Sequence, residues 1–313
     1  MMRSKVVVVG ALCLSAVLAA CGGSDNGQPP LAISAANQQA VASEVLIGAG
    51  QVTGGGGVSG GISYAPVVVA AIKPQVAALA STARRSPGQP LPADGTENCA
   101  FGGTLTTATS GTTSAKVTYS QCQQTQGIAL DGTVNETLNL GTNTISASLS
   151  LDLTATIGTL SIAESGDLEL HLSSGNDLSF DMTSDHLEAS IKSNGTLVDD
   201  ITLSSLAVHF GTSTSGGQTV SSASEKYHID SSKLVGSFTV TSTGNVTVGS
   251  GKYAASGTLT ITGASGSTLT ITIMGDETYT AASGEGQIKL ELNGTVTWTN
   301  WADLAAAAAV GKT

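Results

Sequence analysis

From about residue 100 onward, the chain alternates apolar and polar residues with a period of two. The apolar residues of each run share one parity, and Thr, Ser and Asn fill the positions between them. Such alternation is typical of strands with one buried face and one face in water. The clearest runs are Ile128, Leu130, Val134, Leu138 and Leu140; Leu149, Leu151 and Leu153; Leu168, Leu170 and Leu172; Leu259 and Ile261; Leu269, Ile271 and Ile273; and Ile288, Leu290, Leu292, Val296 and Trp298.

The repeated pattern predicts a mainly β protein with a large antiparallel meander sheet. One-sided alternation over roughly a dozen runs is typical of an antiparallel sheet with one face on the core. That face needs a cover, so we expect the sheet to close as a barrel or curved half-barrel, or to pack against helices. Three residue pairs are signals for turns or bulges: Asp131-Gly132, Asn194-Gly195 and Asn293-Gly294. A hairpin loop is predicted at 263–267. A bulge is predicted between Leu203 and Leu206, where the apolar residues shift from odd to even positions.

Helical patterns lie before and after the strands. Ser34 can cap a first N-terminal helix, and Pro66 can open a second one that Pro74 kinks. After the strands, Asn300 can cap a short Ala-rich helix over 301–310. The apolar positions are Ala36, Ala40, Val41 and Val45 in the first helix, and Val68, Ile72, Val76 and Leu79 in the second.

The N-terminus has the pattern of an export signal. Arg3 and Lys5 precede the apolar residues 6–18, a run shorter than the ~20 residues of a membrane-spanning helix. The sequence Leu18-Ala19-Ala20-Cys21 resembles the lipobox of bacterial lipoproteins. The resemblance implies cleavage before Cys21 by lipoprotein signal peptidase, and a diacylglycerol on the Cys21 thiol. The alternative is an ordinary secretory signal with a chance cysteine.

The same resemblance implies a location and a division of the chain. Gly22 stands where Asp would retain an enterobacterial lipoprotein in the inner membrane, so the outer membrane is expected, with lipid anchoring at its periplasmic face or at the cell surface. Two or three acyl chains on one cysteine give a stable anchor. We expect a signal peptide at 1–20, a lipidated tether at 21–30, a helical and Gly-rich region with a Pro-rich linker at 31–98, and an antiparallel β domain with a C-terminal helix at 99–313.

The four cysteines divide by their expected fates. Cys13 leaves with the signal peptide and Cys21 carries lipid, so Cys99 and Cys122 remain. A pair of cysteines in an oxidising compartment predicts a disulfide, the alternatives being two free thiols or half of a metal site. The segments Cys99-Ala100-Phe101-Gly102-Gly103-Thr104 and Tyr119-Ser120-Gln121-Cys122 resemble those of uncharacterised β-rich lipoproteins of Gram-negative bacteria, a likeness that implies no activity.

Charge and motif context exclude several classes of function. The formal net charge is −11, and removal of the signal peptide takes away two bases and no acid, so nucleic acid and anionic lipid head groups are poor partners. The Gly-rich stretch 48–54 lacks the helix of a dinucleotide loop. The G-x-S-x-G match at 57–61 lacks the preceding strand of a nucleophile elbow. We therefore expect no catalytic residues and no cofactor.

The remaining polar candidates have simple interpretations. His171, Asp181, Asp185 and His186 could form a zinc site if strands bring them together, although solvent-facing histidines are the simpler interpretation, and we expect no metal. Asp199-Asp200 is expected to be a charged turn, because adjacent strand residues face opposite ways and cannot form a dyad. Trp298 and Trp301 are expected in the core.

Two functions remain open. The first is an outer-membrane-anchored lipoprotein, not an enzyme, with a structural or partner-binding role. The second is a lipid or apolar-ligand carrier that uses the apolar face of a curved sheet and resembles in architecture the periplasmic carriers whose half-barrel holds acyl chains against helices. The expected partners are the membrane, through the lipid anchor, and a lipid or another envelope protein.

Overall fold

The computed structural model describes most of the predicted β region and one N-terminal segment. The predictions for the signal peptide, for Cys21 and for the helix with Pro66 lie outside the described residues, as does the Pro-rich linker up to residue 93. The described residues are 27–46, 94–111, 113–140, 144–174, 178–215, 218–242, 246–248, 254–276 and 278–309.

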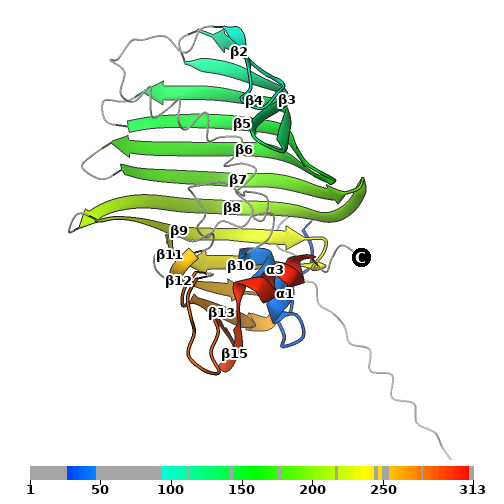
Figure 1. The fold of residues 1–313 in the computed structure, drawn as a ribbon, viewed down its shortest axis with the longest axis vertical. Coiled ribbons are helices and arrows are strands. Elements are labelled where there is room, and N and C mark those ends of the chain that lie inside the picture. The colour runs from blue at the N-terminus through cyan, green and yellow to red at the C-terminus, as the bar shows by residue number, and fades with distance from the viewer. Residues whose placement is uncertain are drawn as a thin grey trace, which may run out of the picture.

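One antiparallel sheet of 15 strands contains most of the described chain (Figure 1). Neighbouring strands follow the order of the chain, except that β11 pairs with β9 and β12 beside the main path. The strands are β1 (Gly95–Asn98), β2 (Thr104–Ser110), β3 (Ser114–Thr125), β4 (Ile128–Leu140), β5 (Thr144–Ile157), β6 (Leu160–Ser174), β7 (Leu178–Ser193), β8 (Thr196–Ser215), β9 (Gln218–Ser231), β10 (Gly236–Ser242), β11 (Val246–Val248), β12 (Ala254–Thr262), β13 (Thr268–Ile273), β14 (Ile288–Leu292) and β15 (Thr295–Thr299).

This architecture confirms the predicted antiparallel meander. Within the described residues β1 and β15 are the two ends of the strand order, so the sheet is open and does not close into a barrel. The sheet begins at Gly95, before the boundary expected at Cys99. Tight turns explain the simple strand order. Asn194-Gly195 and Asn293-Gly294 both have positive φ at the two central positions, which suits the primed turns of two-residue hairpins.

The apolar parity of the strands is confirmed in most runs. Leu149, Leu151 and Leu153 are all at most 3% exposed, and Leu269 and Ile271 are fully buried. The loop at 263–267 forms the predicted hairpin between β12 and β13. The parity slip in β8 is a bulge, as predicted, with a register shift between Ser204 and Ala207.

The parity prediction is wrong for β15. Val296 is 44% exposed and Trp298 is half-buried, whereas Thr299 is buried. The two-residue turn at 293–294 pairs Leu292 with Thr295, so the face that holds even-numbered residues in β14 holds odd-numbered residues in β15. Turn geometry therefore overrides the apolar pattern on this edge strand.

Two short helices lie at the end of the sheet that contains β10 to β15 (Figure 1). They are α1 (Gln38–Leu46) and α3 (Trp301–Ala309). Val41 and Val45 of α1 are fully buried as expected, but Ala36 is exposed because it precedes the helix. No described helix is long and apolar enough to span a membrane.

The predicted cap is confirmed for α3, whereas α1 begins at Gln38, four residues after Ser34. The Asn300 side chain accepts a hydrogen bond from the backbone nitrogen of Asp303 at 2.9 Å, which confirms the predicted cap of α3. At α1 the Ser34 carbonyl accepts from the backbone of Gln38, while the Asn37 side chain accepts from the backbone nitrogen of Ser34 at 2.7 Å. The cap of α1 therefore depends on the Asn37 side chain as well as on Ser34.

The segment before α1 runs along the sheet. The backbone nitrogen of Gln28 donates to Asp230 at 3.1 Å, and that of Leu31 donates to the carbonyl of Ser237 at 2.8 Å. Pro30 forms a parallel bridge with Ser237. The chain is thus attached to β9 and β10 as soon as its described part begins.

Candidate functional site

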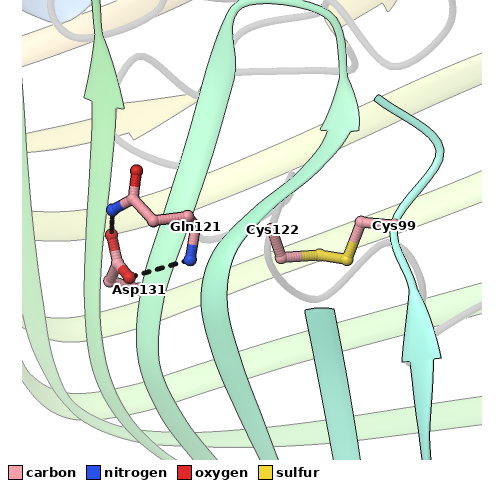
Figure 2. Close-up of a disulfide and its surroundings, with 4 residues drawn as sticks. All are labelled: Cys99, Gln121, Cys122 and Asp131. Atoms are coloured by element: carbon pink, nitrogen blue, oxygen red, sulfur yellow. Dashed lines mark hydrogen bonds between the residues drawn. A yellow bond between two sulfur atoms is a disulfide. The ribbon is translucent and has the colours of Figure 1, made fainter. Parts of the chain in front are cut away.

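Cys99 and Cys122 form the predicted disulfide, with Cα atoms 5.4 Å apart (Figure 2). Cys99 follows β1 and Cys122 lies in β3, and both side chains are at most 6% exposed. The bond therefore joins the start of the sheet to its third strand. The lipidation site, Cys21, lies outside the described residues.

The residues around the disulfide have a structural role. Gln121 has a φ of 47° and forms a bulge in β3, where its backbone nitrogen donates to Asp131 at 2.9 Å and its side chain donates to the same carboxylate (Figure 2). Gly103 has a φ of 74°, and a Cβ there would overlap the carbonyl oxygens of Ser120 and Gln121. This close approach explains Gly103, and a φ of 125° explains its neighbour Gly102.

The outer face carries a row of histidines and a carboxylate. His171 in β6 and His209 in β8 each lie directly opposite Asp181 in β7. The His209 Nδ1 atom lies 2.5 Å from Asp181, and His186 instead pairs with Glu188 at 2.9 Å. Two of the four candidate zinc ligands are therefore brought together. Among the described residues, no three His, Cys, Asp or Glu side chains are placed to hold a metal ion.

A buried polar network surrounds Asp199. The structure places Asp199 and Asp200 within β8, so the predicted turn is wrong, but the two residues do face opposite ways: Asp199 is 1% exposed and Asp200 is exposed. The Asp199 carboxylate accepts hydrogen bonds from the backbone nitrogen of Lys233 at 2.8 Å and from the hydroxyls of Ser231 and Ser232.

The same network reaches the helix α1. Lys233 Nζ lies 3.1 Å from the carboxylate of Glu44, which is itself buried. Burial, together with the charge of Glu44, raises the pKa of Asp199 to about 6. The network therefore joins α1 to β8 and to the turn after β9, and its groups satisfy one another.

The inner face holds three further carboxyls that the sequence analysis did not single out. Glu136 in β4, Glu164 in β6 and Glu225 in β9 all occupy the apolar parity of their strands. Burial raises the pKa of Glu136 to about 7 and those of Glu164 and Glu225 to about 8. An acidic residue at an apolar position was the signal that could have found them.

Two of these carboxyls have apolar neighbours across the sheet. Glu164 lies opposite Leu153 in β5 and Ala189 in β7, and Glu225 lies opposite Val208 in β8. Each of the two side chains belongs to a residue that is 4% exposed. In the described part of the chain, one Glu164 oxygen and both Glu225 oxygens are buried without a hydrogen-bond partner.

Tyr227 adds a third unsatisfied group beside Glu225. It lies two residues along β9, on the same face, and is 2% exposed. Its hydroxyl has no hydrogen-bond partner among the described residues. Burial and the charge of Glu225 raise the pKa of the Tyr227 hydroxyl well above its ordinary value. We therefore take the inner face around Glu225 and Tyr227 as the candidate site.

Trp301, by contrast, is part of the core, as predicted. It is 2% exposed, and its indole nitrogen donates to the carbonyl of Gly275 at 2.9 Å. Its polar atom is thus satisfied inside the protein, unlike the hydroxyl of Tyr227.

Comparisons with known proteins add no family to this picture. No family model matches the chain, and neither the curated proteins nor the solved structures that were searched include a match. The function must therefore be argued from the geometry of the chain itself.

Proposed function

We propose that this protein is a lipid-anchored envelope protein, not an enzyme, that binds a lipid or another apolar ligand on the inner face of its sheet. In this proposal Cys21 carries the outer-membrane anchor, and the apolar side of the strands binds the ligand. The observation that carries it is the set of buried polar oxygens of Glu164, Glu225 and Tyr227 that lack partners in the described part of the chain.

The physical argument concerns the cost of those oxygens. A buried polar group without a hydrogen bond destabilises a protein by about 1–3 kcal/mol, so native proteins satisfy nearly all of them. Three such side chains on one face carry a large cost for a purely structural surface. A ligand that reaches this face and supplies hydrogen bonds would offset the cost, and this supports a binding role over a structural one.

The size of the apolar face supports the same role. Strands in a sheet lie 4.7–4.9 Å apart, so the seven strands from β3 to β9 span roughly 30 Å. The hydrocarbon core of a bilayer, which holds two acyl chains end to end, is also about 30 Å thick. The inner face is therefore wide enough for an extended acyl chain that lies across the strands.

Native mass spectrometry tests the ligand. The protein is exported to the periplasm with Cys21 replaced by Ser and a conventional signal peptide, then purified without detergent. Co-purifying lipid is the expected result, and acid-denatured protein from the same sample supplies the bare mass as a control. A bare polypeptide mass from the native sample would contradict ligand binding and favour a structural or partner-binding role.

Metabolic labelling tests the anchor separately. Cells that express the unaltered chain and the Cys21→Ser variant are fed a radiolabelled fatty acid. The unaltered protein should carry label and fractionate with the outer membrane, whereas Cys21→Ser should carry none. A matched Cys13→Ser variant should be labelled normally. Label that persists in Cys21→Ser would show that lipid is attached elsewhere.

A further inference from the structure

Glu225 and Tyr227 form a compact polar patch on an apolar face. They are two residues apart on β9, which lies between the long strand β8 and the shorter strands near α1 and α3 (Figure 1). Their neighbours across the sheet are Val208, opposite Glu225, and Val240, opposite Tyr227. Val208 and Val240 are at most 2% exposed, so these two neighbours of the patch are buried and apolar.

The patch presents three oxygen atoms. The Tyr227 hydroxyl is also a donor, and the Glu225 carboxyl, whose pKa burial raises to about 8, offers only acceptors once it loses its proton. Both carboxyl oxygens of Glu225 and the hydroxyl oxygen of Tyr227 are buried without a partner among the described residues. The backbone nitrogen of Glu225 donates to the Ser242 hydroxyl at 2.8 Å. Among the described residues, its side-chain oxygens accept no hydrogen bond.

Asp199 shows that this fold can satisfy a buried carboxylate. Its side chain receives hydrogen bonds from two hydroxyls and one backbone nitrogen. Glu225 has a comparable burial and none of these donors in the described chain. A ligand would supply the hydrogen-bond donors that the Glu225 side chain lacks.

We propose that Glu225 and Tyr227 bind the amine head group of an apolar ligand, an inference that rests on the proposed ligand-binding function. A primary ammonium has three N–H donors and no acceptor, which complements three acceptor oxygens. Hydrogen bonds between charged partners are about twice as strong as neutral ones. An alcohol has a single hydrogen-bond donor. A carboxylate has only acceptors, which do not complement the acceptor oxygens of the patch.

Binding of chain-matched probes tests the head-group preference. Dodecylamine, dodecanol and laurate, each below its aggregation concentration, are titrated into the full-length Cys21→Ser protein by calorimetry. The amine should bind roughly tenfold or more tightly than the alcohol, and laurate should bind most weakly. Equal affinities for the three probes would overturn the head-group assignment while leaving apolar-ligand binding intact. Failure of all three probes to bind would overturn both.

Variants locate the preference on the sheet. Glu225→Gln should reduce the amine-to-alcohol ratio to about one, and Tyr227→Phe should reduce it by a smaller factor. Glu136→Gln is the matched control, because it makes the same change in a carboxyl of the same face that is not part of the proposed site, and it should leave the ratio unchanged. Circular dichroism confirms that each variant is folded. A ratio that survives Glu225→Gln, or one that Glu136→Gln removes equally, would overturn the proposal.

Discussion

Asp199 and Glu225 are two buried carboxyls that the same sheet treats in opposite ways. Both belong to residues at most 4% exposed, and burial raises the pKa of both. Asp199 accepts hydrogen bonds from two hydroxyls and a backbone nitrogen, whereas both oxygens of Glu225 lack partners in the described chain. The comparison shows that burial alone does not identify a binding group. The absence of local donors separates a candidate ligand contact from a structural network.

The largest expected effect that separates the two sites is a pH dependence of stability. Burial raises the pKa values of Glu164 and Glu225 from the ordinary 4.5 to about 8, so the folded protein holds these protons more tightly than the unfolded chain. Their contribution to stability is therefore retained at low pH and lost as the pH rises from about 4.5 through about 8. Each pKa unit is worth about 1.4 kcal/mol, so the free energy of unfolding should fall by several kcal/mol over this range.

Urea unfolding at half-unit pH steps measures this effect. The double variant Glu164→Gln, Glu225→Gln should lose most of the slope between pH 6 and pH 8. Asp199→Asn should change the slope only below about pH 6, because the pKa of Asp199 is raised from 3.8 to about 6. A flat profile in the unaltered protein would show that these carboxyls are ionised or paired in solution.

The next largest effect is expected for removal of the satisfied carboxylate. Asp199→Ala leaves the donors of Ser231, Ser232 and Lys233 without their acceptor, and should lower the free energy of unfolding by about 3 kcal/mol. Asp200→Ala, at the exposed neighbouring position, is the control and should change stability by less than about 0.5 kcal/mol. Equal losses in the two variants, measured by urea unfolding, would contradict the structural role of the network.

The smallest effect has the opposite sign. Glu225→Leu replaces an unpartnered polar group with an apolar one of similar size on an apolar face, so stability should rise by roughly 1 kcal/mol. The same variant should lose the preference for an amine ligand. Thermal unfolding at about pH 4.5, where the folded protein keeps the Glu225 carboxyl protonated, measures this gain separately from the larger pH-dependent cost. A clear loss of stability would mean that Glu225 makes a structural hydrogen bond.

The sequence was sufficient to predict the sheet but not its polar interior. Period-two alternation predicted the antiparallel meander and most of the buried positions, because a half-buried strand leaves a local signature. The number of cysteines expected to remain after export was enough to predict the pair of Cys99 and Cys122. The error at Val296 and Trp298 was avoidable, since a two-residue turn reverses the inward parity of the next strand.

The candidate site was partly visible in the same pattern. Three acidic residues occupy positions where the alternation of their strands predicts apolar ones, namely Glu136, Glu164 and Glu225. This exception to the pattern is visible in the sequence alone. The Asp199 network could not be predicted in this way, because Glu44 and Lys233 are far apart in the chain and meet only after α1 packs on the sheet. Whether a buried carboxyl is satisfied depends on such distant partners.

In the proposed lipid-anchored protein, the attachment of residues 28–31 to β9 and β10 would limit how far the sheet can move from the membrane. Gln28 is seven residues after Cys21. Because an extended chain advances at most about 3.6 Å per residue, an acylated Cys21 would lie no more than roughly 25 Å from the point where Gln28 contacts the sheet. This distance is shorter than the thickness of one bilayer. An anchored molecule would therefore hold the β9–β10 region, with Glu225 and Tyr227, close to the lipid head groups, while the far end of the meander could extend into the surrounding solution.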